Sequence, residues 1–212
     1  MTLQGDEALI SRLRESFSPH GSRAFDVAMM ETVYGRPFCV ETAGERFPEP
    51  RPAARPIGGH LEGCRIGFDA GGSDRKVSAV IDGEPVFSEE VVWFPKTNSD
   101  PDYHYQGIVD AMKSAAAHMP RVDAIGVSSA GIYIDNRTMV ASLFLKVGKE
   151  DFDAKVKDIY IRAAKEFGDV PIVVANDGDV SALAGAMSLE DNNVLGIAMG
   201  TSEAVGLSLI HI

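Results

Sequence analysis

Residues 69–76, DAGGSDRK, place a carboxylate, two glycines and a hydroxyl where we expect a tight hairpin turn. Glycines let backbone N–H groups approach anionic oxygens, and Asp69 can hold the Mg²⁺ that accompanies phosphates. The alternative is an ordinary turn with a solvated aspartate, since glycine-rich turns are common. The segment is not a Walker A loop, because the pattern G-x-x-x-x-G-K-[ST] occurs nowhere in the chain.

Residues 176–179, NDGD, follow an expected buried strand and open an expected helix. An aspartate at that point can cap the helix, which by itself is the better interpretation. It can also act as a general base against a substrate hydroxyl. We assign Asp179 to the first turn of the helix and leave Asp177 for chemistry.

A third segment, Gly200-Thr201-Ser202, follows an expected strand over residues 194–199. Small residues and two hydroxyls at a strand end suit phosphate binding, and a plain turn explains them equally well. Taken alone, this segment does not indicate a phosphate site; it does so only together with the other two segments.

The elements that position these segments alternate between strands and helices. Expected strands cover residues 65–69, 76–81, 85–94, 122–128, 171–175 and 194–199, and expected helices cover 101–119, 150–167 and 180–189. Asp82-Gly83 is a hairpin signal, so the first three strands form an antiparallel meander. A meander followed by alternating helices and strands predicts an α/β layered domain.

The first sixty residues differ in texture from the rest of the chain. Helical spacing predicts short helices over residues 9–17 and 24–34. Four prolines, at positions 48, 50, 52 and 56, then indicate an extended linker, and we place a domain boundary near residue 60.

Taken together, the three polar segments resemble the sugar-kinase/actin/heat-shock ATPase superfamily, whose core is a ribonuclease-H-like domain. Within it the chain resembles the ROK family of bacterial sugar kinases and repressors. Residues 69–76 match the family motif D-x-G-G-[TS]-x-x-K, Asn176-Asp177 with residues 181–183 match N-D-x-x-x-A-A-L, and Gly200-Thr201 match the second phosphate motif. The resemblance covers about residues 63–206.

The resemblance implies an ATP-dependent phosphotransferase that acts on a sugar or sugar-like hydroxyl, with ATP and Mg²⁺ as cofactors. Asp177 would be the general base and Asp69 the metal ligand. The implied substrate residues are Asn176, Ser129 and Gly131, the last two from the small-residue segment 128–131 that the resemblance places at the sugar cleft. The implied phosphate-binding residues are Gly71, Gly72, Ser73, Lys76, Gly200, Thr201 and Ser202. Lys76 can equally point to solvent from its strand. The implied partners are a nucleotide and a small sugar, and a homodimer remains open.

Two acidic residues depart from the family pattern. Asp74 follows the glycines of the first motif, and Glu203 stands where the second motif usually continues with glycines. Carboxylates close to a triphosphate repel it, so these residues favour an alternative, a nucleotide-binding ATPase or switch of the same fold without sugar kinase activity. A non-enzymatic ROK-type regulator ranks last, because residues 1–60 are short for a winged helix-turn-helix and lack a basic recognition helix.

We therefore expect three parts: a helical extension and linker over 1–60, a ribonuclease-H-like lobe of the actin-like ATPase fold over 61–191, and opening strands of an incomplete second lobe over 192–212. On this interpretation the chain as given is an inactive fragment. Residues 207–212, LSLIHI, are what CTGTCTCTTATACACATC encodes, a sequence that matches a transposase adapter. They are either a read-through artefact or a genuine strand.

Composition narrows the class of protein. With 31 acidic and 20 basic residues the formal net charge is −11, which makes nucleic acid an unexpected partner. No apolar run approaches the ~18–20 residues that span a bilayer, and no basic segment opens the chain as in a signal peptide. Cys39 and Cys64 make no disulfide framework, the five histidines lack metal-ligand spacing, and Trp93 is expected to fill the sheet face. These features predict a cytoplasmic protein that does not enter a membrane.

Overall fold

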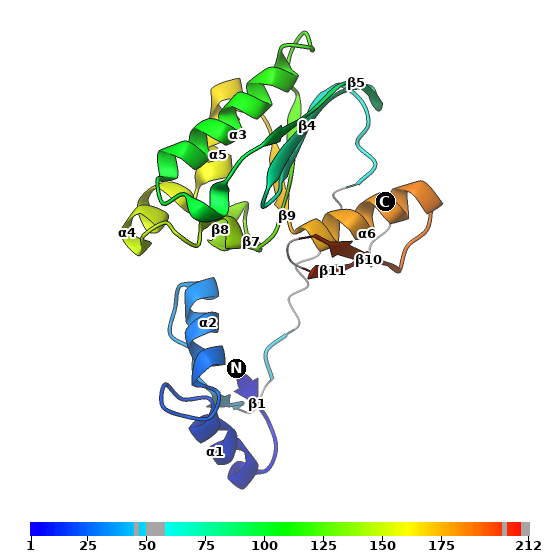
Figure 1. Ribbon diagram of the computed structural model, residues 1–212. Helices are drawn as coiled ribbons and strands as arrows, with labels where there is room; N and C mark the ends of the chain where they lie inside the picture. The colour runs from blue at the N-terminus through cyan, green and yellow to red at the C-terminus, as the bar shows by residue number, and fades with distance from the viewer. Residues whose placement is uncertain (45–46, 50–57, 201–202, 209–212) are drawn as a thin grey trace. The chain divides into compact units, whose positions relative to one another are not determined.

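The computed structural model describes residues 1–44, 47–49, 58–200 and 203–208, and divides the chain into two compact units, 1–54 and 55–212 (Figure 1). In the first unit, strand β1 (Thr2–Leu3) pairs in parallel with β2 (Glu41–Thr42) beside helices α1 (Glu7–Ser16) and α2 (Ala24–Tyr34). Both helices confirm the sequence prediction. The Asp6 side chain caps α1, and Gly35, at φ 62°, ends α2.

The second unit is built on a five-stranded sheet in the order β5-β4-β3-β6-β9. Its strands are β3 (Cys64–Ala70), β4 (Asp74–Ile81), β5 (Glu84–Val92), β6 (Ala124–Ser129) and β9 (Ile172–Ala175). The first three are antiparallel, whereas β6 and β9 join β3 in parallel. The structure confirms the predicted meander and the α/β class.

Helices cover the two faces of this sheet differently. In β3, Ile66 and Phe68 are buried against α3 (Pro101–Ala116) and α5 (Ile159–Ala164), which lie on one side in Figure 1. Gly67 and Asp69 alternate to the opposite face, where α6 (Asp177–Leu189) lies. The site residues therefore belong to the face away from the main core.

The structure confirms helical turns over most of the predicted segment 150–167 and buries Val156, Ile159 and Ala163 of its apolar face, but the segment is not one regular α-helix. It consists of α4 (Lys149–Asp151), a π-helical turn η3 (Phe152–Val156), α5 and a 3₁₀ turn η4 (Lys165–Phe167). The cause lies in a hairpin that the sequence analysis missed, β7 (Ile132–Ile134) and β8 (Arg137–Val140). Thr138 of β8 donates its N–H to the Lys157 carbonyl at 2.9 Å, and Arg137 pairs with Asp158 at 2.7 Å. These tertiary contacts override the local helical pattern.

Smaller elements complete the second unit. Two 3₁₀ turns, η1 (Pro95–Thr97) and η2 (Ser142–Phe144), contact each other, and β10 (Val194–Met199) pairs antiparallel with β11 (Glu203–Ser208). Leu207 and Ser208 pair with Leu195 and Val194, while Thr201, Ser202 and residues 209–212 lie outside the described residues. No helix in the described part of the chain is long and apolar enough to cross a membrane.

Helix α6 packs against the β10–β11 hairpin backbone to backbone. A Cβ at Gly196 would lie 2.1 Å from the Ala182 nitrogen, and one at Gly206 would lie 2.4 Å from the Gly178 carbonyl oxygen. Such distances are shorter than any van der Waals contact, so only glycine permits this approach.

We predict that Gly196→Ala separates the hairpin from α6. Overpacking at such a contact costs about 1–3 kcal/mol, so amide hydrogen exchange in β10 and β11 should accelerate by about tenfold or more. The matched control is Gly200→Ala in the same hairpin, where an added Cβ meets nothing within 4 Å. Unchanged exchange in Gly196→Ala would contradict the packing.

Candidate functional site

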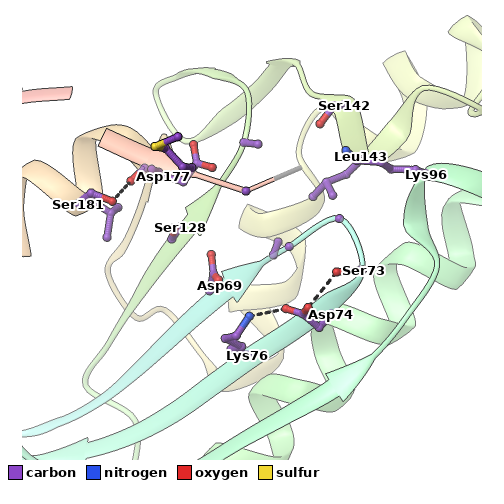
Figure 2. A pocket seen from close by; sticks show the side chains of 18 of the residues that line it. Asp69, Ser73, Asp74, Lys76, Lys96, Ser128, Ser142, Leu143, Asp177 and Ser181 are labelled. Carbon is purple, nitrogen blue, oxygen red and sulfur yellow. Dashed lines mark hydrogen bonds and ion pairs between the residues drawn. The ribbon is translucent and has the colours of Figure 1, made fainter. Parts of the chain in front are cut away.

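A cavity of about 500 Å³ opens where the β3–β4 turn, the end of β6, the start of α6 and the end of β10 converge (Figure 2). Seven of the residues singled out from the sequence line it: Asp69, Gly71, Gly72, Ser73, Lys76, Asp177 and Gly200. Residues of all three polar segments therefore meet at one place, although the segments are spread between residues 69 and 202 of the sequence.

The register of the parallel strands places the carboxylates there. Asp69 pairs with Ser128, and Ser128 pairs with Ala175 at the end of β9. Parallel strands present their carboxyl ends at the same sheet edge, so Asp69 and the start of α6 follow one another along that edge. Burial raises the pKa of Asp69, a hydrogen bond with Ser128 and the charge of Lys76 oppose the rise, and the negative charge of Asp177 adds to it.

Helix α6 begins at Asp177, three residues earlier than predicted. The reason is Asn176, whose side-chain oxygen accepts a hydrogen bond from the Gly178 N–H at 2.9 Å and caps the helix. Asp177 and Asp179 thus both lie in the first turn. Figure 2 shows Asp177 above Asp69 in the cavity, and the Ser181 hydroxyl donates to the Asp177 carbonyl at 2.8 Å. Burial and the charge of Asp177 raise the pKa of Asp179.

The glycine turn is tied to neighbouring elements. The Trp93 indole N–H donates to the Gly71 carbonyl at 2.8 Å, and the Trp93 backbone N–H donates to the Ser73 carbonyl at 3.1 Å. Trp93 is buried, which confirms its expected packing role, but its hydrogen bond to the turn was not foreseen. Sequence alone could not reveal this bond, because Trp93 follows β5 and only the meander returns it to the turn.

Within the turn, Asp74 engages two groups that were expected to face phosphate. Lys76 forms an ion pair with Asp74, and the Ser73 hydroxyl donates to the other Asp74 oxygen at 2.9 Å. The hydrogen bond and charge of Lys76, with the Ser73 hydroxyl, hold the pKa of Asp74 below its ordinary value. Lys76 is therefore directed at Asp74 in the cavity lining, and its positive charge is largely compensated.

Three predicted substrate residues do not line the cavity. The buried Ser129 hydroxyl accepts a hydrogen bond from Tyr160 at 3.0 Å, on the helix side of β6. The Asn176 amide donates to the Gly131 carbonyl at 2.9 Å, and Gly131 has a φ of 155°. Their contacts support the backbone around the cavity, and their binding of substrate stays a prediction. Thr201 and Ser202 are outside the described residues.

The cavity also contains Lys96 and Ser142, which the sequence analysis missed. Ser128 and Ser181, which line it as well, belong to segments 128–131 and 181–183, which the resemblance had already pointed to. Ser128 pairs with Asp69 in the parallel register and lines the same cavity. Lys96 and Ser142 carry no recognisable motif and enter the cavity through the contact between η1 and η2.

Comparison with known proteins gives structural likeness only. Neither protein-family models nor curated protein sequences match this chain. The inorganic polyphosphate/ATP-glucomannokinase of Arthrobacter sp. strain KM superposes with a TM-score of 0.53 at 21% identity, covering 68% of this chain and 57% of that one. The chain therefore shares the fold of part of this sugar kinase. A putative N-acetylmannosamine kinase from Listeria monocytogenes gives a TM-score of 0.48 at 25% identity, over 69% of this chain and 47% of that one.

This sugar-kinase-like fold corresponds to part of its structural relatives, since the chain spans about half the length of the kinases that it matches. A relative at such low identity shows the architecture. The residues that line the cavity of this chain are therefore the basis for proposing an activity.

The donor set of the cavity fits a magnesium ion that arrives with phosphates. No group of three or more His, Cys, Asp or Glu side chains in the described residues could hold a metal ion by itself. Mg²⁺ usually binds through one or two carboxylates plus substrate phosphates, and Asp69 and Asp177 line the same cavity as the glycine turn. Burial, with a smaller contribution from the charge of Asp177, raises the pKa of Asp69, and a bound Mg²⁺ would oppose this rise.

We predict that Asp74→Asn strengthens nucleotide binding. Without the carboxylate, the Lys76 ammonium and the Ser73 hydroxyl become available to phosphate, so affinity for Mg²⁺-ATP should rise by about three- to tenfold in isothermal titration calorimetry. Glu84→Gln, which neutralises an exposed carboxylate on β5, is the matched control for net charge. Weaker binding in Asp74→Asn would show that Asp74 itself assists the ligand.

A second prediction concerns the pH dependence of stability. Because burial raises the pKa of Asp69, stability falls as pH rises from the ordinary carboxyl range, about 4, through the raised value. Asp69→Asn should therefore be more stable than the natural protein at pH 7, with the difference shrinking toward pH 3. Urea unfolding followed by the fluorescence of Trp93, the one tryptophan, measures this. An equal gain at both pH values would contradict the electrostatic cause.

Proposed function

We propose that this chain carries the phosphate-binding lobe of a sugar kinase, which transfers a phosphoryl group from ATP to a sugar hydroxyl. The observation that carries the proposal is the meeting of Asp69, the glycine turn and Asp177 in one cavity. The sugar-kinase-like fold supports it. We further propose that β10 and β11 are the opening strands of a second lobe.

In this mechanism the protein mainly positions groups and balances charge. Backbone N–H groups of Gly71 to Ser73 and of Gly200 would bind phosphate oxygens, since all these residues line the cavity. Asp177 would accept the proton of the attacking hydroxyl, and Asp69 would hold Mg²⁺, which supplies neutralisation of phosphate charge. Asn176 would position Asp177 by fixing the start of α6.

A second candidate, a nucleotide-binding switch without sugar kinase activity, is favoured by one observation. Asp74 compensates Lys76 and engages Ser73, which weakens the phosphate site expected for rapid transfer. The other departure from the family pattern has less bearing on the cavity, because Glu203 is exposed on β11 and is not among the residues that line it.

The test is Asp177→Asn in a protein that contains this chain with a complete second lobe. ADP release is measured with ATP and a panel of sugars. Turnover should fall by at least about 10²-fold, the low end for removal of a general base, while ATP affinity stays nearly unchanged. The matched control is Asp179→Asn, in the same helical turn but outside the cavity lining.

Each outcome has a defined meaning. Sugar-dependent turnover that depends on Asp177 supports the kinase, and sugar-independent ATP hydrolysis supports the switch. Normal turnover in Asp177→Asn would remove Asp177 from the mechanism and leave it a purely structural residue of the first helical turn.

A further inference from the structure

One end of the cavity is formed by the two 3₁₀ turns and contains a lysine that the proposed mechanism does not use. Lys96 of η1 and Ser142 of η2 both line the cavity, and the two turns contact each other. In Figure 2, Lys96, Ser142 and Leu143 are labelled on one side of the view, and Asp177 and Ser181 are labelled on the other. This end is therefore distinct from the position of the proposed general base.

The backbone that presents Lys96 is held from several sides. Each ring nitrogen of the buried His104 lies within hydrogen-bond distance of a carbonyl oxygen, that of Pro95 at 2.9 Å and that of Asp100 at 2.8 Å. The His104 ring also contacts the ring of Phe144 in η2, with centroids 5.1 Å apart. Next to η1, the buried Trp93 bonds to the glycine turn. Contacts with buried residues therefore fix the backbone position of Lys96.

Among the residues that the structure describes, the charged groups of the cavity do not pair with Lys96. Three carboxylates line the cavity, and the one nearest Lys76, Asp74, forms an ion pair with it. Lys96 makes no ion pair or hydrogen bond with any side chain in the part of the chain that the structure describes. It is half-buried, so its charge is only partly solvated.

Ser142 supplies a second, independent observation. Its hydroxyl oxygen is buried in the cavity lining and has no hydrogen-bond partner among the described residues. A buried hydroxyl without a partner costs about 1–3 kcal/mol, so such groups usually meet a partner supplied by water or ligand. A hydroxyl donor and an ammonium group that line the same cavity can both bind the oxygens of an anionic group.

We propose that Lys96 and Ser142 form an anion subsite that binds a phosphate or carboxylate group of the ligand. The inference deepens the proposed function, on which it rests for the identity of the cavity as the ligand site. An anionic group bound here belongs either to the phosphoryl donor or to an acidic sugar, such as a sugar carboxylate. Both sources share the same recognition by one cation and one hydroxyl.

The experiment measures equilibrium binding to the chain by isothermal titration calorimetry, with ATP, gluconate and neutral glucose as separate probes. At least one of the two anions should bind the natural protein, and Lys96→Met should weaken that binding by about tenfold or more. Ser142→Ala should weaken it in the same direction. Lys146→Met, which removes an exposed lysine outside the cavity lining, should leave it unchanged.

The pattern identifies the source of the anion. A loss confined to ATP assigns the subsite to the donor, and a loss confined to gluconate assigns it to an acidic acceptor. The proposal is overturned if neither anion binds, if Lys96→Met binds as the natural protein does, or if Lys146→Met is weakened equally. Equilibrium binding does not depend on turnover. The anion-binding result can therefore be interpreted even if the protein shows no kinase activity. Unchanged fluorescence of Trp93 in each variant verifies the fold.

Discussion

The parallel register of β3, β6 and β9 is the constraint on which the site depends. It aligns Asp69, Ser128 and Ala175 across one sheet edge, so Asp69, near the end of β3, and the helix that follows β9 face the same space. A shift of one residue in either pairing would turn Asp69 from the cavity into the core, because side chains alternate along a strand. The meander and the helices α3 and α5 serve to hold this register.

A second constraint, the close packing of α6 against the β10–β11 hairpin, places the end of β10 at the same cavity. Gly178, Gly196 and Gly206 let α6 and the β10–β11 hairpin approach through their backbones, so the hairpin is packed directly against the helix that bears Asp177. Gly200, at the end of β10, thereby reaches a cavity that begins with Asp69. The site is thus assembled from one edge of the sheet and one glycine-packed pair of elements.

The charged groups of the cavity differ in whether another protein group compensates their charge. Burial and the neighbouring carboxylates raise the pKa of Asp69, because both disfavour its charged form. Carboxylates with such shifted pKa values are common at sites that bind a cation or transfer a proton. Asp74 and Lys76 compensate each other at the turn, which leaves Lys96 as a positive charge without a described partner. A ligand with negative charge, accompanied by a divalent cation, complements this distribution.

Sequence by itself determined the α/β class, the order of the main elements and the three segments that meet in the cavity, since hydrophobic periodicity and glycine-rich strand ends are local signals. It also predicted Asp69, Gly71 and Asp177 as candidate site residues, and these line one cavity. Tertiary structure decided what local signals cannot carry. Thr138 breaks the helix predicted over 150–167, Asn176 rather than an aspartate caps α6, and the contact between η1 and η2 brings in Lys96 and Ser142. In each case the outcome depends on a contact with a residue distant in sequence or on the backbone geometry of a helix cap. The spacing of residue types along the sequence reveals neither.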